Sequence, residues 1–151
     1  MPVFGRGLAL VVAVALLAAA GSSSVAQAQG TSRYAVCAGC HQNHGRGMPP
    51  AFPPLAGSEF VVAAHEIPVR IVLLGVQGPL TVGGQRFNGA MPAWGSFSDA
   101  DIAATLTYVR SQWGNGAAAV TPQQVAAVRA ALAGRTRAWT GAEIDAMRSG
   151  N

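Results

Sequence analysis

The stretch CAGCHQNH, residues 37–44, contains both cysteines of the chain and two of its three histidines. Thiols and imidazoles at this spacing can attach a haem, bind zinc, or form a redox-active disulfide. Attachment of a haem uses each residue of the CxxCH pattern. Cys37 and Cys40, three positions apart on a helical turn, can each bond to one vinyl group, and His41 is then carried under the iron as a ligand. The motif therefore favours a covalently attached haem.

Two other interpretations of the motif remain open at this point. A thiol oxidoreductase places its CxxC at the start of a helix that follows a strand in a βαβ unit, and the sequence has no such pattern. Zinc could be bound by Cys37, Cys40, His44 and the distant His65. Zinc ribbons, however, usually pair two cysteine knuckles, and this sequence has one.

A haem bound through His41 would leave the sixth position of its iron to another residue. The candidates in the sequence are Met48, His65, Met91 and Met147. Met48 is too close to His41 in the sequence to reach round the ring. His65 lies on an otherwise apolar segment, and Met147 is typical of a core residue. Met91 lies 50 residues beyond His41 in an irregular loop, in which Gly89 permits unusual φ and Pro92 prevents a helix. We expect Met91 to be the sixth ligand.

The elements that position these residues are predicted to be mostly helical. The predicted helices are one that starts at Thr31 or Ser32 and enters the cysteine motif, then 58–66, 68–75, 98–113, 121–134, and a short last helix opening at Thr140. Residues 45–57, rich in proline and glycine, predict an ordered loop. A hairpin with Gly-Gly at its turn is expected at 80–89, too small to form a sheet.

The first 28 residues are typical of a secretory signal peptide. Arg6 is followed by an apolar run of 13 residues, 8–20, and then by the small-residue cleavage pattern Ala26-Gln27-Ala28. The run is shorter than the roughly 17 to 25 residues that span a bilayer, and an uncleaved anchor is the alternative. Cleavage would leave 123 of the 151 residues, enough for one domain, with no membrane span predicted in the mature chain.

The charge of the chain excludes one class of partner. All ten basic residues are arginines, and loss of Arg6 with the leader would leave nine against six acidic residues, a net charge of +3. The arginines are spread along the chain and are not interleaved with aromatic residues. We therefore predict no nucleic-acid partner.

Four segments in order resemble the class I cytochromes c. They are CAGCH, FPPLAG (52–57), FNGAMPAWG (87–95) and SDADIAATLTYVRSQWG (98–114). The resemblance implies an all-α cytochrome c fold, with short helices around one haem c, a small β-hairpin and an extra C-terminal helix. It also implies that the carbonyl of Pro53 accepts the N–H of His41, and that the N- and C-terminal helices cross, with Tyr34 against Tyr108 or Val109.

The predicted function follows from these ligands. With His41 and Met91 both on the iron, no site remains for a substrate, so we expect an electron carrier and not an enzyme. The alternative is a haem enzyme or small-ligand sensor in which Met91 dissociates. The resemblance implies redox partners such as a dehydrogenase, a copper enzyme or a terminal oxidase, and a periplasmic location or one at the outer face of the cytoplasmic membrane. The predicted division is a signal peptide at 1–28, a haem domain at 29–114 and a C-terminal extension at 115–151.

Overall fold

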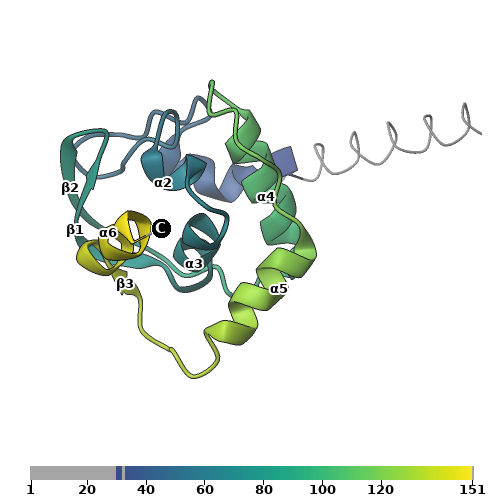
Figure 1. The fold of residues 1–151 in the computed structure, drawn as a ribbon. Helices are drawn as coiled ribbons and strands as arrows, with labels where there is room; N and C mark the ends of the chain where they lie inside the picture. The colour runs from purple at the N-terminus through teal and green to yellow at the C-terminus, as the bar shows by residue number, and fades with distance from the viewer. Residues whose placement is uncertain (1–29, 32, 151) are drawn as a thin grey trace, which may run out of the picture.

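The computed structural model describes residues 30, 31 and 33–150, so the predicted signal peptide lies outside the described residues. Residues 30, 31 and 33–41 are helical and form the first helix. The later elements are α2 (Glu59–Val62), α3 (Glu66–Leu74), β1 (Val76–Val82), β2 (Gln85–Met91), α4 (Asp99–Ser111), α5 (Pro122–Ala131), β3 (Trp139–Thr140) and α6 (Gly141–Ser149). Figure 1 shows α4 and α5 along one side of the molecule and the strands with α6 on the other.

The first helix crosses α4 at a point of close backbone contact. Gly30 packs on the carbonyl of Ala104 so tightly that a β-carbon at residue 30 would overlap it. One turn along, the rings of Tyr34 and Tyr108 lie with centroids 5.4 Å apart, and Val109 belongs to the same buried cluster. The predicted contact of Tyr34 with α4 is confirmed. This crossing fixes the start of the helix that contains the cysteine motif.

The break between α2 and α3 lies earlier than predicted. The sequence predicted helices at 58–66 and 68–75, whereas α2 ends at Val62 and α3 begins at Glu66. The cause is Arg110 of α4, a buried residue whose guanidinium donates to the carbonyls of Val61 and Ala63. Carbonyls that accept from an arginine do not need the next helical turn to satisfy them, so α2 stops there.

The hairpin is longer than expected and belongs to a sheet. β1 and β2 pair antiparallel around the turn at Gly83 and Gly84, which both have positive φ. Contrary to the prediction that the hairpin is too small for a sheet, β3 adds a third strand, parallel to β1, in the order β2-β1-β3. A strand of two residues far along the chain carries almost no sequence signal, because its pairing is set by tertiary contact.

The helices with capping patterns form where the sequence predicts them. Ser98 accepts from the Asp101 N–H at 3.1 Å, and Thr121 and Thr140 each form a complete capping box. Two of these helices are shorter than predicted, since α4 ends at Ser111 and α5 at Ala131. In the described part of the chain, no helix is both long and apolar enough to cross a membrane.

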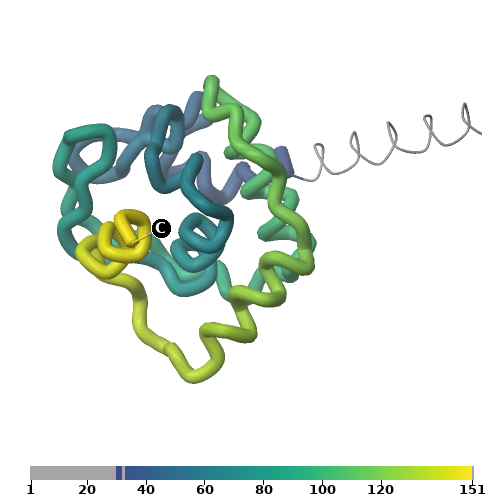
Figure 2. The backbone as a smooth tube through the Cα atoms, in the orientation of Figure 1, coloured from purple at the N-terminus to yellow at the C-terminus, as the bar shows by residue number. Residues whose placement is uncertain are grey.

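The C-terminal segment packs on the rest of the fold. Val125 and Val128 of α5 share a buried cluster with Val69 and Ile102. After α5 the chain runs across the molecule to α6, beside the hairpin, as Figure 2 shows. The carboxylate of Glu143 accepts from the Thr140 N–H and from two arginines that precede β3, Arg135 and Arg137.

This set of contacts predicts a pH dependence of stability. The Thr140 N–H first, and then the two arginines, lower the pKa of Glu143 from 4.5 to about 2. Because the folded pKa is depressed, the stabilisation is complete above about pH 4.5 and is lost as the pH falls toward 2. We expect Glu143→Gln to lower the melting temperature of the holoprotein at about pH 6, with a difference from wild type that disappears near pH 2.

Asp145→Asn is the matched control on the same helix. The Asp145 carboxylate lies 3.9 Å from Arg148, at the limit of an ion pair, so its removal is expected to change the melting temperature little at any pH. A Glu143→Gln difference that stays constant between these pH values would contradict the assigned role of the carboxylate.

Candidate functional site

A cavity is lined by residues of both the first helix and the hairpin. Val36, Cys37, Cys40 and His41 line one side of it, and residues 51–53 line another. The rest of the lining is one face of the hairpin together with residues 90–92 and Trp94. This part of the lining is made of apolar residues.

The two cysteines lie on one turn of the first helix and both face the cavity. Each is partly buried and neither forms a disulfide. Burial, and then the neighbouring Cys40, raises the pKa of a free Cys37 thiol to about 11. A redox-active cysteine needs a lowered pKa to form its thiolate, so this environment does not suit a thiol oxidoreductase.

His41 is buried at the end of the same helix, and its ring has one fixed hydrogen bond. Nδ1 lies 2.9 Å from the carbonyl oxygen of Pro53, the acceptor that the resemblance implied. A carbonyl can only accept, so Nδ1 carries the proton and Nε2 keeps a free lone pair. Burial lowers the pKa of His41, against the opposing effect of the Pro53 carbonyl. The ring is therefore a neutral imidazole in the tautomer that a metal requires at Nε2.

Met91, the last residue of β2, also lines the cavity. Its backbone pairs with Val76, the first residue of β1. The chain that follows is tied to α3, because the Trp94 N–H donates to the carbonyl of Val72 at 2.8 Å. These contacts fix the Met91 segment against β1 and α3.

The other candidate ligands lie elsewhere. Met48 is exposed, and Met147 packs against the cluster beneath α6. His65 approaches the Glu66 carboxylate at 3.4 Å, and the exposed His44 accepts from the backbone N–H of Arg46. Among the four candidates for the sixth position, all of them described, Met91 is the one that lines the cavity.

The residues present fit a haem and do not fit zinc. The apolar cavity suits a flat apolar ring, and the two thiols and a neutral imidazole line the same cavity. A zinc site would need Cys37, Cys40, His44 and His65 together. Within the described residues no three His, Cys, Asp or Glu side chains are grouped as metal ligands.

Comparison with known proteins decides between these interpretations. The family model described as "Cytochrome c" matches residues 27–113. The chain belongs to the cytochrome c family. It is 37% identical to a cytochrome c-552 of Thermus thermophilus over 134 aligned residues, which cover 74% of this chain and 90% of that protein.

A second relative is much longer than this chain. The cytochrome c subunit of the quinone-type alcohol dehydrogenase of Gluconacetobacter polyoxogenes is 35% identical over 100 residues. The match covers 64% of this chain but 21% of that subunit, so this chain corresponds to a small part of it.

Membership of the family settles the cofactor and the class of function. The cytochrome binds one haem c, with its iron, covalently through Cys37 and Cys40. It is an electron-transfer haem protein and not an enzyme. The predicted all-α cytochrome c fold, with a small β-hairpin and an extra C-terminal helix, is confirmed, and the structure is mostly helical with a small three-stranded sheet.

The hairpin contributes residues to the cavity that were not among the predicted site residues. Val76, Gly78 and Leu80 of β1 line it, as do Phe87 and Gly89 of β2. Side chains two apart share one face of a strand, so both sets follow a period of two. That alternation is visible in the sequence, and it could have shown that one face of the hairpin is apolar and turned inward.

The hydrogen bond of His41 to Pro53 depends on Gly47, and this gives a prediction. Gly47 has a φ of +64°, and a β-carbon there would overlap the carbonyls of Phe52 and Pro53. Gly47→Ala must displace the Pro53 carbonyl from the His41 ring. We expect a loss of about 3 kcal/mol of stability, from the left-handed φ and the overlap together. We also expect a higher reduction potential, because an imidazole without this acceptor donates less charge to ferric iron.

Gly57→Ala is the matched control for Gly47→Ala. Gly57 has a φ of +68°, and nothing lies within 4 Å of its added β-carbon. Gly57→Ala is expected to lose about 1 kcal/mol of stability, from the left-handed φ alone, with no change of reduction potential. Denaturant unfolding and redox titration of both holoproteins measure the two effects. Equal potentials in the two variants would contradict the link between Gly47 and His41.

Proposed function

We propose that the cytochrome is an exported carrier of single electrons whose iron is held between His41 Nε2 and the sulfur of Met91. The observation that carries the proposal is that these two residues, which come from different elements, line one apolar cavity. The fixed tautomer of His41 supports its role as the proximal ligand, with Pro53 as the orienting acceptor.

Bound haem iron supplies reversible one-electron chemistry. The protein groups around it set how easily the electron moves. With haem bound, the imidazole of His41 and the thioether of Met91 would both be ligands of the iron, so a substrate or oxygen would find no open site. The soft sulfur of Met91 favours the ferrous state, and the apolar walls from Val76 and Phe87 keep water away. Both effects favour a positive potential and little rearrangement on electron transfer.

Substitution of Met91 tests the proposed ligand. The ferric wild-type holoprotein is expected to show the far-red absorption band of a sulfur-to-iron bond. Met91→Ala should lose the band and lower the reduction potential by on the order of 0.1 V, a fraction of the roughly 0.8 V that axial ligands span. Met48→Ala and Met147→Ala are the controls and should keep both properties. A wild-type protein without the band, or a Met91→Ala protein with it, would contradict the proposal.

The face beside the cysteines is proposed as the docking surface for redox partners. The side chain of Val36 lines the cavity and is 45% exposed, and Met48 is 42% exposed. Arg46 and Arg86 are exposed, and neither forms an ion pair with a described residue. An apolar surface with few charges favours docking by short-range contact over long-range steering.

Electron self-exchange between ferrous and ferric copies measures this docking without a natural partner. Val36→Ser is expected to slow self-exchange by roughly threefold to tenfold, because about 1 kcal/mol of apolar contact is lost from the encounter complex. Val62→Ser is the control, since Val62 is 43% exposed and does not line the cavity. Equal rates in the two variants, at unchanged potential, would contradict the proposed surface.

The proposed partners are a donor and an acceptor such as a dehydrogenase, a copper enzyme or a terminal oxidase. The similarity to a cytochrome c subunit of a quinone-type alcohol dehydrogenase supports a dehydrogenase in particular. We further propose that 1–28 is a signal peptide directing export to the periplasm or the outer face of the cytoplasmic membrane, that 29–114 is the haem domain, and that 115–151 is an extension of it. The family match, which ends at residue 113, supports the last boundary.

A further inference from the structure

Strand β1 connects the C-terminal segment to the backbone of Met91. β1 is the middle strand of the sheet, so Val76 has Met91 as its partner on one side and Trp139 on the other. Gly75, just before β1, is held from both sides as well. Its carbonyl accepts the Trp139 N–H at 3.0 Å, and a β-carbon on Gly75 would overlap the Met91 carbonyl. The backbone of Met91 therefore rests on residues that β3 holds in place.

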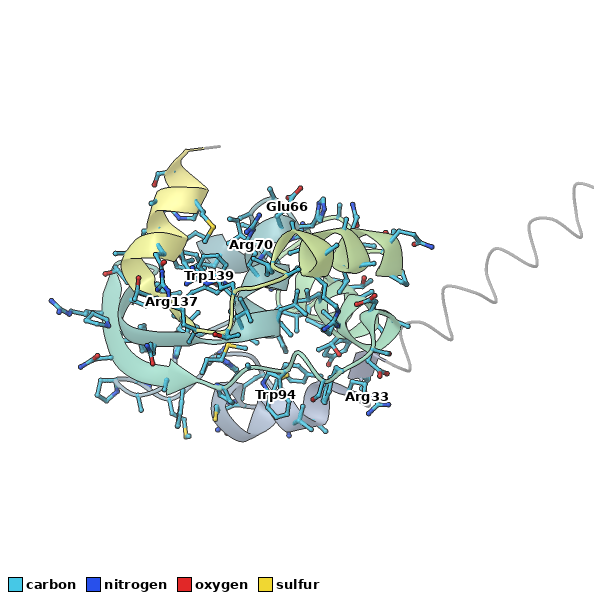
Figure 3. The ribbon with its side chains drawn as sticks, turned by 90° about the horizontal axis from the view of Figure 1, so that it is seen from below. Arg33, Glu66, Arg70, Trp94, Arg137 and Trp139 are labelled. Atoms are coloured by element: carbon cyan, nitrogen blue, oxygen red, sulfur yellow. The ribbon has the colours of Figure 1, made fainter. Side chains whose placement is uncertain are left out.

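The indole of Trp139 packs behind the cavity wall. It is 6% exposed and shares a buried cluster with Val76 and Phe87, both of which line the cavity. Its Nε1 donates to the carbonyl of Arg70 in α3 at 3.0 Å. Figure 3 shows Trp139 near Arg70 and close to the first turn of α6. Trp139 thus joins two elements: the hairpin, which ends at Met91, and α3, to which the chain after Met91 is hydrogen-bonded through Trp94.

The chain on either side of Trp139 is itself fixed. The guanidinium of Arg135 lies over the indole, 3.5 Å from the ring centroid, and its charge is met by Glu143. On the other side, Gly141 packs directly on the carbonyl of Pro79 in β1, where a β-carbon would overlap it. These contacts hold the indole against the sheet in one position.

We propose that Trp139 is a positioning residue for Met91, acting through Gly75 and Val76 to keep the methionine sulfur at the iron. The inference rests on the proposed role of Met91 as the sixth ligand. Without the indole, β3 keeps its backbone pairing with β1 but loses the packing on Val76 and Phe87 and the hydrogen bond to Arg70 that hold it in place. Met91 then spends a larger fraction of time away from the iron. An added ligand that competes for the iron then binds more tightly, in proportion to that fraction.

The test is imidazole binding to the ferric holoprotein, followed by loss of the far-red band. Trp139→Ala is expected to tighten imidazole binding at least about tenfold. Trp139→Phe keeps a ring in the cluster and loses the Nε1 donor, so it should restore part of the wild-type behaviour, with binding about threefold tighter than wild type. The control is Val128→Ala in α5, because Val128 is equally buried but belongs to the other cluster, away from the cavity. It should lower the melting temperature and leave imidazole binding unchanged.

Imidazole binding in Trp139→Ala within about twofold of wild type would overturn the inference, as would an equal tightening in Val128→Ala. If Trp139→Ala does not fold, Trp139→Phe decides: tighter binding supports the inference and unchanged binding overturns it. The proposed function fails separately. A wild-type protein without the far-red band removes Met91 as a ligand, whereas a wild-type band with unchanged imidazole binding in the Trp139 variants overturns the positioning role alone.

Discussion

The hydrogen bond between the His41 ring and the Pro53 carbonyl is the contact on which the site depends. It fixes the tautomer of the only buried histidine among the described residues, and it ties the cysteine helix to the loop that forms the floor of the cavity. Because Gly47 is packed directly against that carbonyl, the loop has little freedom to move. The neutral imidazole, the two thiols and the apolar space beside them are thereby held in one arrangement.

The hairpin side of the cavity has a different origin. Its two strands pair with each other, and residues of α3, β3 and α6 pack with them in one buried cluster. A two-stranded hairpin alone is marginally stable in water. The C-terminal segment therefore does more than cover a surface, since its Trp139 packs behind residues that face the cavity. This arrangement connects a segment outside the family match to the proposed iron ligand.

Local patterns carried most of the fold prediction. The capping residues Ser98, Thr121 and Thr140 act within three positions of themselves, and the Gly83-Gly84 turn needs only its two positive φ values, so these elements could be predicted from sequence. The break after α2 could not, because it depends on Arg110, which lies far along the chain. The pairing of β3 with β1 could not for the same reason. For the site, the CxxCH motif identified the residues on one side of the cavity. That His41 and Met91 line the same cavity depends on tertiary contacts between distant parts of the chain.

We propose that the haem iron lies between the imidazole of His41 and the thioether of Met91. X-ray absorption spectroscopy at the iron edge of the ferric holoprotein identifies the atoms bonded to the metal. We expect a sulfur atom bonded to the iron together with nitrogen atoms, and no bonded sulfur in the Met91→Ala protein. A first shell of nitrogen and oxygen alone in the wild-type protein would contradict it.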